Sequence, residues 1–253
     1  MKLTILGSGT GWIRLDRSAP GHLLEAEDFC LLLDCGAGVI KQILKLGKKL
    51  EDISAIFISH FHPDHVSDLI PFFFATRYNL GYKRILPINL YSAEDFSIFF
   101  ELLKRAFNNW VEPPEGLLII NTLPKKKNHS FFIGPFRAFT SPVKHNPESL
   151  AIRLEYKNKS LVYSGDTGYC EELIELSKCA DLLLIECSNS EEEYVEHHLS
   201  PQDIADIAKK AKVKRVVLTH FYPHSEKVNL ESFKKKGFLG EVILAKDLME
   251  INL

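Results

Sequence analysis

The densest group of metal-ligating side chains in this sequence lies in the short segment 60–65. Three imidazoles and one carboxylate occur there, at His60, His62, Asp64 and His65. An apolar run over 53–59 precedes the segment, and a helix-like apolar run follows it. Imidazole and carboxylate are ligands that suit zinc, manganese and iron. The segment therefore predicts a metal site between a buried strand and a helix.

Further side chains of the same kinds follow other apolar stretches. Asp166 and His220 come just after the predicted strands 160–164 and 215–219, and His145 lies in a similar position farther along the chain. Ligand sites in layered α/β proteins gather at the carboxyl ends of strands, so we expect these side chains to meet the first group. Five imidazoles and two carboxylates would serve two adjacent metals. Such a pair can clamp the attacking and leaving oxygens of a displacement and lower the pKa of a shared water.

The hydrophobic pattern predicts alternating strands and helices. Strands are expected at 2–6, 22–25, 29–33, 53–59, 84–91, 117–122, 131–140, 150–156, 160–164, 181–185, 215–219, 241–244 and 249–253. Helices are expected at 38–46, 64–78, 93–109, 171–177 and 201–210. Aromatic residues recur at helical spacing within 96–107, and we expect them in the core. The portions 1–115 and 116–253 share a pattern of strands, a polar cluster and a helix, which predicts a single domain, 1–253, of two similar halves.

Composition narrows the class of protein. Hydrophobic residues make up 45% and charged residues 25%, as in ordinary globular proteins. A formal net charge of −2 gives no overall basic field of the kind that attracts nucleic acid. Five cysteines without a C-x-x-C pair favour free thiols in a reducing compartment. No signal-peptide pattern or membrane-length apolar segment is evident, so we expect a cytoplasmic protein without a membrane partner.

The signature H-x-H-x-D-H over 60–65, with His145, Asp166 and His220 following in order, resembles the metallo-β-lactamase superfamily. The resemblance covers nearly the whole chain and implies a four-layer αββα sandwich with two divalent metals. Zinc is expected, with manganese or iron as alternatives. By this resemblance His60, His62 and His145 bind one metal, Asp64, His65 and His220 bind the other, and Asp166 bridges them. Asp34 would support the motif loop rather than bind metal.

Within that superfamily the chain is most similar to the ribonuclease Z group. The similarity rests on Leu6-Gly7-Ser8-Gly9-Thr10, Asp34-Cys35-Gly36-Ala37-Gly38, Ser164-Gly165-Asp166-Thr167, Thr219-His220-Phe221, and Ile185-Glu186-Cys187 followed by His198-Leu199-Ser200. It implies that His198 acts on the scissile phosphate or the leaving group, and that Glu186 orients it. A phosphodiester leaving oxygen needs a proton, and a carboxylate can hold imidazole in the required tautomer.

Two features depart from the members of that group that process tRNA. Only twenty residues separate His145 from Asp166, where those enzymes usually carry a long arm that grips tRNA. His220 is followed by Phe221-Tyr222-Pro223-His224, where they typically have a serine and an arginine. Both departures disfavour tRNA 3′ processing. The acidic run within 191–196 would also repel a nucleic-acid backbone if it flanked the cleft.

We therefore expect a phosphodiesterase acting on a nucleotide, a cyclic nucleotide or an RNA 3′ end. A metal-bridging hydroxide would attack phosphorus, Asp64 would orient it, and His198 would protonate the leaving group. The alternatives are a thioester or lactone hydrolase, which would not need Glu186 and His198, a tRNA 3′-processing endonuclease, and a non-catalytic metal-binding protein. The resemblance also implies a homodimer. His22 is expected to be structural, and His224 is expected to lie at the surface.

Overall fold

The computed structural model describes residues 1–77, 84–190 and 194–253. In these ranges most of the apolar runs become strands: β1 (Lys2–Gly7), β2 (Gly21–Ala26), β3 (Phe29–Leu33), β4 (Ala55–Phe57), β5 (Ile88–Ala93), β6 (Leu118–Leu123), β7 (His129–Ile133), β8 (Phe136–Pro142), β9 (Leu150–Tyr156), β10 (Lys159–Tyr163), β11 (Leu182–Glu186), β12 (Arg215–Thr219), β13 (Glu241–Leu244) and β14 (Glu250–Asn252). The helices are α1 (Val39–Lys45), α2 (Pro63–Val66), α3 (Leu69–Arg77), α4 (Phe96–Phe107), α5 (Glu171–Leu176), α6 (Pro201–Ala211) and α7 (Leu230–Lys235), with short 3₁₀ turns η1 (Leu50–Asp52) and η2 (Asn108–Val111).

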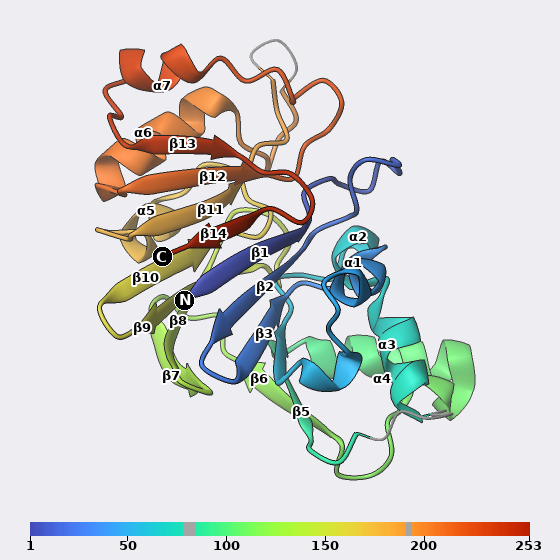
Figure 1. Ribbon diagram of the computed structural model, residues 1–253. Helices are drawn as coiled ribbons and strands as arrows, with labels where there is room; N and C mark the ends of the chain where they lie inside the picture. Colours follow the sequence, from blue (N-terminus) through green and yellow to red (C-terminus); the bar gives the residue numbers. More distant parts are fainter. Residues whose placement is uncertain (78–83, 191–193) are drawn as a thin grey trace.

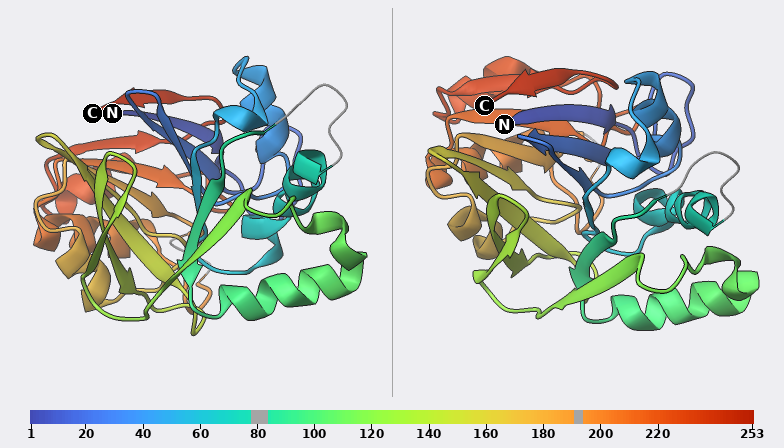
Figure 2. Two further views of the ribbon diagram at one scale, coloured as in Figure 1. Left: turned by 90° about the horizontal axis from the view of Figure 1, so that it is seen from below. Right: turned by 60° about the horizontal axis from the view of Figure 1, so that its bottom comes forward.

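Across the described ranges the strands pair into two mixed seven-stranded sheets. The first has the order β14-β1-β2-β3-β4-β5-β6, and the second has the order β13-β12-β11-β10-β9-β8-β7. The two sheets lie face to face with helices on their outer sides, and the chain termini lie close together (Figures 1 and 2). The expectation of a four-layer αββα sandwich is confirmed. The division into halves at about 115 and 116 stays a prediction, and the pairing places β6 and β14 in the first sheet.

Three apolar cores separate the four layers. The middle core lies between the sheets and contains Leu31 from β3 and Leu154 from β9, both fully buried. The second core packs α5 and α6 against the second sheet, and the third packs α1, α3 and α4 against the first. Burial on both faces explains why the central strands read as continuous apolar runs. In the described ranges no helix has the length and apolar character needed to span a membrane, and the five cysteines are free thiols.

Parallel pairing brings the carboxyl ends of several strands to one edge. β3 and β4 run parallel in the first sheet, and β10, β11 and β12 run parallel in the second. Asp34 follows β3, and the His60 segment follows β4. Asp166 follows β10, Glu186 ends β11, and His220 follows β12. The convergence of these side chains is thus a consequence of strand direction.

The helix predicted over 64–78 is wrong as one element. The structure has two helices there, α2 and α3, which are separated by Ser67 and Asp68. Pro71 lies in the first turn of α3, where its missing N–H costs nothing, but within one continuous helix it would break the bond to residue 67. The amide of Asp68 instead donates to the Cys35 carbonyl at 3.0 Å. Tyr78, the predicted end, lies outside the described residues, as do residues 191–193 of the acidic run.

The single strand predicted over 131–140 is also wrong. The chain turns at Gly134 and Pro135, so that β7 and β8 form an antiparallel hairpin. Gly134 has φ 52°, and a Cβ there would collide with the ring of Phe29. The strand expected from Arg84 begins only at Ile88, because the buried Arg84 guanidinium donates to the carbonyls of Leu50 and Ile53. Helix α7 was not predicted at all.

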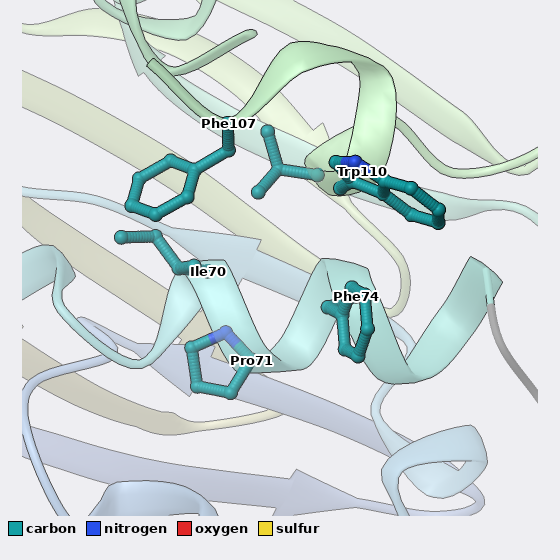
Figure 3. A pocket seen from close by; sticks show the side chains of 6 residues that line it. Ile70, Pro71, Phe74, Phe107 and Trp110 are labelled. Carbon is teal, nitrogen blue, oxygen red and sulfur yellow. The ribbon is translucent and has the colours of Figure 1, made fainter.

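The aromatic stripe of α4 was expected in the core, and that expectation is only partly right. Phe96 and Phe100 are buried, whereas Phe107 is 42% exposed. Phe107 lines an apolar pocket of about 510 Å³ together with Ile70, Pro71, Phe74, Trp110 and Val111. Figure 3 shows the α3 side chains facing Phe107 and Trp110 across this pocket. The helix is longer than the sheet face that it covers, so its last turn passes beyond the core.

Candidate metal centre

The motif loop is fixed by its exit from β4 and its entry into α2. Pro63 occupies the first turn of α2, where its ring suits the helical φ and no N–H is needed. The amide of His65 donates to the His62 carbonyl at 2.9 Å, and the amide of Cys35 donates to the His65 carbonyl at 2.8 Å. A Cβ on Gly36 would collide with the carbonyl oxygen of Asp64. Close approach at this glycine therefore places the motif directly against the end of β3.

Asp34 lies beneath the motif and is completely buried. Its carboxylate accepts hydrogen bonds from the amide and the hydroxyl of Ser59, both at 2.7 Å, and from the hydroxyl of Tyr163 at 2.6 Å. The Nδ1 atom of His65 lies 2.7 Å from the same carboxylate. These contacts orient the His65 ring so that its Nε2 faces Asp166, at 3.3 Å.

All seven side chains predicted as ligands meet at this edge of the sandwich. One group comprises His60, His62, His145 and Asp166, and a second comprises Asp64, His65 and His220. Within each group the ligand atoms lie no more than 4.8 Å from one another. Asp166 lies between the groups, because its carboxylate oxygens are 3.8 Å from Nε2 of His60 and 3.4 Å from Nε2 of His220.

Neighbouring groups fix which ring nitrogen each imidazole presents. The hydroxyls of Ser59 and Ser188 lie 3.0 and 2.8 Å from the Nδ1 atoms of His60 and His220. The carbonyl of His197 lies 3.2 Å from Nδ1 of His145. Each of these three rings therefore directs Nε2 toward the cluster. Ser59 and Ser188 were missed by sequence reasoning, since an isolated serine carries no signal of such a role.

His62 is held in the opposite sense. Its Nε2 lies 2.9 Å from Nδ2 of Asn146, and its Nδ1 lies 3.2 Å from Nε2 of His145. The ring therefore turns Nδ1 toward the cluster. Asn146 was also missed, although it directly follows His145 in the sequence.

The residues of the cluster fit a divalent metal. The Nε2 atoms of His60 and His65 are buried and have no hydrogen-bond partner among the described residues. Unpaired buried nitrogens are rare in folded proteins and call for an ion or another partner. Burial and the neighbouring His65 hold the pKa of His60 well below its usual range. This favours the neutral ring that binds metal.

The carboxylates of the cluster favour their charged form. Burial acts to raise the pKa values of Asp64 and Asp166, but the nearby imidazoles of His220 and His65 outweigh it and lower both pKa values below their usual range. Ionised carboxylates are oxygen ligands that zinc and similar ions accept.

Glu186 and His198 form a pair beside the ligand cluster. Oε1 of Glu186 lies 2.8 Å from Nδ1 of His198, and the carboxylate is almost completely buried. Burial acts to lower the pKa of His198, but the hydrogen bond and charge of Glu186 raise it to about 9. The imidazole lies between two ligands, with ring centroids 5.1 Å from His145 and 6.0 Å from His220. The pair therefore places an imidazole whose charged form is favoured at the mouth of the cluster.

Glu186 is also fixed by the main chain. It accepts hydrogen bonds from the amides of Thr167 at 2.9 Å, Ser188 at 3.1 Å and Leu199 at 3.3 Å. The next residue, Ser200, begins α6 with a capping box in which its hydroxyl and the side chain of Asp203 bond the first turn. One carboxylate thus ties the loop after β10 to the start of α6.

Two other histidines differ in how they relate to the cluster. His22 is buried in the core, with its ring 5.1 Å from that of Tyr163. His224 is exposed, as expected, yet its Nε2 lies 3.1 Å from the Ser188 carbonyl. His224 is therefore connected to the cluster through Ser188.

The αββα sandwich and its histidine–aspartate cluster define a metal-dependent hydrolase of the metallo-β-lactamase fold. Residues 1–243 match the family model described as "Anti-Pycsar protein Apyc1", and the chain belongs to this family. The resemblance to the superfamily and to ribonuclease Z is confirmed by relatives that match nearly the whole chain. The use of a divalent metal follows from the same likeness together with the donor set.

Two curated relatives cover almost the whole chain. The "Probable metallo-hydrolase YhfI" of Bacillus subtilis is 28% identical over 253 residues, with 97% of each chain covered. A ribonuclease Z of Methanosarcina acetivorans is 29% identical, covering 100% of this chain and 98% of its own. Among solved structures, YhfI superposes with a TM-score of 0.81 at 24% identity, over 99% of each chain. The short form of human tRNase Z has a TM-score of 0.79 at 25% identity, over 100% of this chain and 99% of its own.

Proposed function

We propose that this hydrolase is a phosphodiesterase that binds two zinc ions. His60, His62 and His145 would hold one ion, Asp64, His65 and His220 would hold the other, and Asp166 would contact both. The positions of these side chains support this assignment, because Asp166 lies near imidazole nitrogens of both groups. When bound, two such ions lower the pKa of a water and neutralise charge on phosphoryl oxygens.

The observation that carries the proposal is the pairing of Glu186 with His198. Nδ1 of His198 is occupied by the carboxylate, so its Nε2 is the atom that donates a proton to the leaving oxygen. An alkoxide that leaves from a nucleotide phosphodiester needs this proton. The buried Glu186 keeps the ring oriented and charged. Asp64 lies across the cluster, 3.4 Å from Nε2 of His220, where its carboxylate can accept a hydrogen bond from the attacking water.

The substrate we propose is a nucleotide, a cyclic nucleotide or an RNA 3′ end. The relatives named ribonuclease Z support a phosphodiester of this kind. Transfer RNA is disfavoured, because the twenty residues between His145 and Asp166 are all described and contribute only β9, β10 and their connections. No arm extends from this part of the chain. The homodimer implied by the resemblance stays a prediction.

A carbonyl hydrolase is the second candidate. The same metal cluster would also activate water toward a thioester or lactone. A thioester gains little from a charged imidazole beside the leaving group, since a thiolate leaves without a proton, whereas the alkoxide that leaves from a lactone would still need one. The geometry of the ligand groups does not distinguish the two reactions, whereas Glu186 and His198 favour the phosphodiester over the thioester.

A side-by-side rate comparison tests the proposal. Zinc-loaded protein is assayed on bis(p-nitrophenyl) phosphate, on 2′,3′- and 3′,5′-cyclic nucleotides, on precursor tRNA, and on a thioester and a lactone. We expect the small phosphodiesters to react fastest, chelation to abolish the rate, and added zinc to restore it. A higher kcat/KM on the thioester or lactone than on every phosphodiester would overturn the proposal. A zinc-loaded protein without any hydrolytic rate would favour the non-catalytic alternative.

A further inference from the structure

The segment after His220 forms a rigid turn at the site. The amide of Tyr222 donates to the Ser225 hydroxyl and the amide of Ser225 donates to the Tyr222 carbonyl, both at 3.0 Å. Phe221 and Ser225 are buried on either side. Pro223 fixes its own φ between them. The side chains that this turn carries therefore have a defined position relative to His220.

Two aromatic rings project from this turn. The Tyr222 ring stands edge-on to the imidazole of His220, with centroids 6.1 Å apart. It lies parallel to the His224 ring at 5.5 Å, with an interplanar angle of 9°. His224 is anchored by the Ser188 carbonyl, and the Ser188 hydroxyl contacts Nδ1 of His220. Ser188 thus contacts the imidazoles of both His220 and His224, and the Tyr222 ring lies beside these two imidazoles.

The stacked pair lies on the side of the cluster that faces Asp64. The Tyr222 hydroxyl has a hydrogen bond with Thr10, and Thr10 is followed by Gly11, where a Cβ would lie 3.6 Å from Cγ of Asp64. Burial raises the pKa of Tyr222, and the carboxylates of Asp64 and Asp166 add to that effect. The ring of His198 lies parallel to the His220 imidazole at 6.0 Å, whereas the Tyr222 ring stands edge-on to it. The predicted proton donor and the Tyr222 ring are therefore both neighbours of this imidazole.

We propose that Tyr222, supported by His224, is the residue of this chain on which the nucleobase of the substrate stacks. This inference rests on the proposed phosphodiesterase activity. The ligand side chains provide only charged and polar contacts for the phosphoryl group, whereas the half-buried Tyr222 ring provides flat apolar surface next to it. Stacking of bases on aromatic side chains is strong and tolerates different bases. Tyr222 thus selects for the presence of a base and His224 positions its ring.

Matched substrates and variants test this role. Adenosine 3′,5′-cyclic phosphate is compared with methyl riboside 3′,5′-cyclic phosphate, which lacks the base. Tyr222→Leu should lower kcat/KM on the nucleotide by about tenfold more than on the base-free substrate. Tyr222→Phe keeps the ring and should stay within about threefold of the wild type. Tyr156→Leu is the control, because Tyr156 is a half-buried tyrosine at the far end of β9.

An equal loss on both substrates in Tyr222→Leu would overturn the inference. A loss in Tyr222→Phe as large as that in Tyr222→Leu would do the same, since it would assign the effect to the hydroxyl. Zinc content and thermal unfolding of each variant show whether the site and the fold are intact. The ratio between the two substrates is insensitive to a uniform loss of folded protein.

A binding measurement separates this inference from the proposed activity. The chain has two tryptophans, so Trp110→Phe leaves Trp12, which follows Gly11, as the only one. In that background, Trp12 fluorescence is titrated with adenosine 5′-monophosphate and with ribose 5-phosphate. We expect Tyr222→Leu to weaken nucleotide binding about tenfold more than sugar-phosphate binding. Selective binding in a protein that hydrolyses no phosphodiester would overturn the proposed activity alone, whereas equal weakening would overturn the role of Tyr222.

Discussion

Asp34 and Glu186 both lie at the carboxyl end of a strand, one in each sheet, and each holds an imidazole in the same way. Asp34 follows β3 in the first sheet, and Glu186 ends β11 in the second. Both carboxylates are buried, and each lies within 2.8 Å of an Nδ1 atom, that of His65 for Asp34 and that of His198 for Glu186. The local arrangement is therefore the same in both places. A carboxylate at a strand end contacts Nδ1 of an imidazole and orients the ring, so that Nε2 is available to bind metal or to donate a proton.

The difference lies in what surrounds the two rings. His65 is completely buried, and its Nε2 faces Asp64 and Asp166. His198 keeps 14% of its side chain exposed at the mouth of the cluster. Asp34 also accepts from two hydroxyls, whereas Glu186 accepts mainly from main-chain amides. Exposure of Nε2, rather than the carboxylate beneath it, separates a predicted metal ligand from a predicted proton donor.

The largest effect should follow from removing the Asp34 carboxylate. Asp34→Ala leaves His65, Ser59 and the Tyr163 hydroxyl without their buried acceptor. Removing one partner from a buried pair typically costs about 3–5 kcal/mol of unfolding free energy. We expect that loss together with a zinc content near zero and no activity. Denaturant unfolding and metal analysis measure both.

Asp28→Ala is the matched control for this substitution. Asp28 is an exposed aspartate in the turn that precedes β3. Its removal should change the unfolding free energy by less than about 0.5 kcal/mol. Full zinc content in Asp34→Ala would contradict a supporting role for Asp34. It would also show that Asp34 and Glu186 do not act in the same way.

Removing the His198 imidazole, which Glu186 orients, should leave the metal in place. His198→Ala should lower kcat about 10²–10⁴-fold on a substrate with an alkyl leaving group, because the leaving oxygen loses its proton donor. The loss should be much smaller with a p-nitrophenolate leaving group, which departs without a proton. His65→Ala should instead lose zinc. Equal losses of rate in His198→Ala on both kinds of substrate would argue against proton donation.

The hydroxyls that contact the ligand imidazoles should have smaller effects. The hydroxyl of Ser59 contacts His60 and also Asp34, whereas the hydroxyl of Ser188 contacts the imidazole and the carbonyl of His220 and no carboxylate among the described residues. Loss of such partners typically lowers metal affinity about 10–100-fold. We expect Ser59→Ala near the upper value and Ser188→Ala near the lower one. Competition with a chelator measures the affinity, and Ser97→Ala, on the exposed face of α4, is the control. The reverse order would show that Asp34 does not act through Ser59.

The roles of Ser59 and Ser188 could not be predicted from the sequence. The ligand side chains could be predicted to converge because each follows an apolar strand, and parallel strand ends meet at one edge. Their orientation could not be predicted, because it depends on Ser59, Ser188 and Asn146, which contact rings that are distant in sequence. Single polar residues of this kind have no pattern of their own.

The errors in the predicted elements have a similar local origin. The run 64–78 is apolar throughout, so periodicity alone did not reveal that Pro71 must begin a new helix. The run 131–140 concealed a hairpin because Gly134 and Pro135 stand between two strands of similar composition. In both places one or two residues that restrict the backbone outweighed the hydrophobic pattern.

The smallest and most specific effect should come from Glu186→Gln. Burial lowers the pKa of His198, but the hydrogen bond and the charge of Glu186 raise it to about 9. The charged ring that donates the proton is therefore present at low pH and is lost as pH rises through about 9. A neutral glutamine keeps the size of the side chain but removes the charge and one of the two acceptor oxygens, so the loss should begin at a lower pH, and thermal unfolding of the variant shows whether the fold tolerates the lost acceptor. The decline of kcat/KM on a cyclic nucleotide as pH rises reports this loss of the charged ring in the free enzyme. Glu115 is exposed, so the control Glu115→Gln should leave the pH of this decline unchanged. If the decline of kcat/KM occurred at the same pH in Glu186→Gln, Glu186 would only orient the ring. Asp34 and Glu186 would then differ only in the exposure of the imidazole that each one holds.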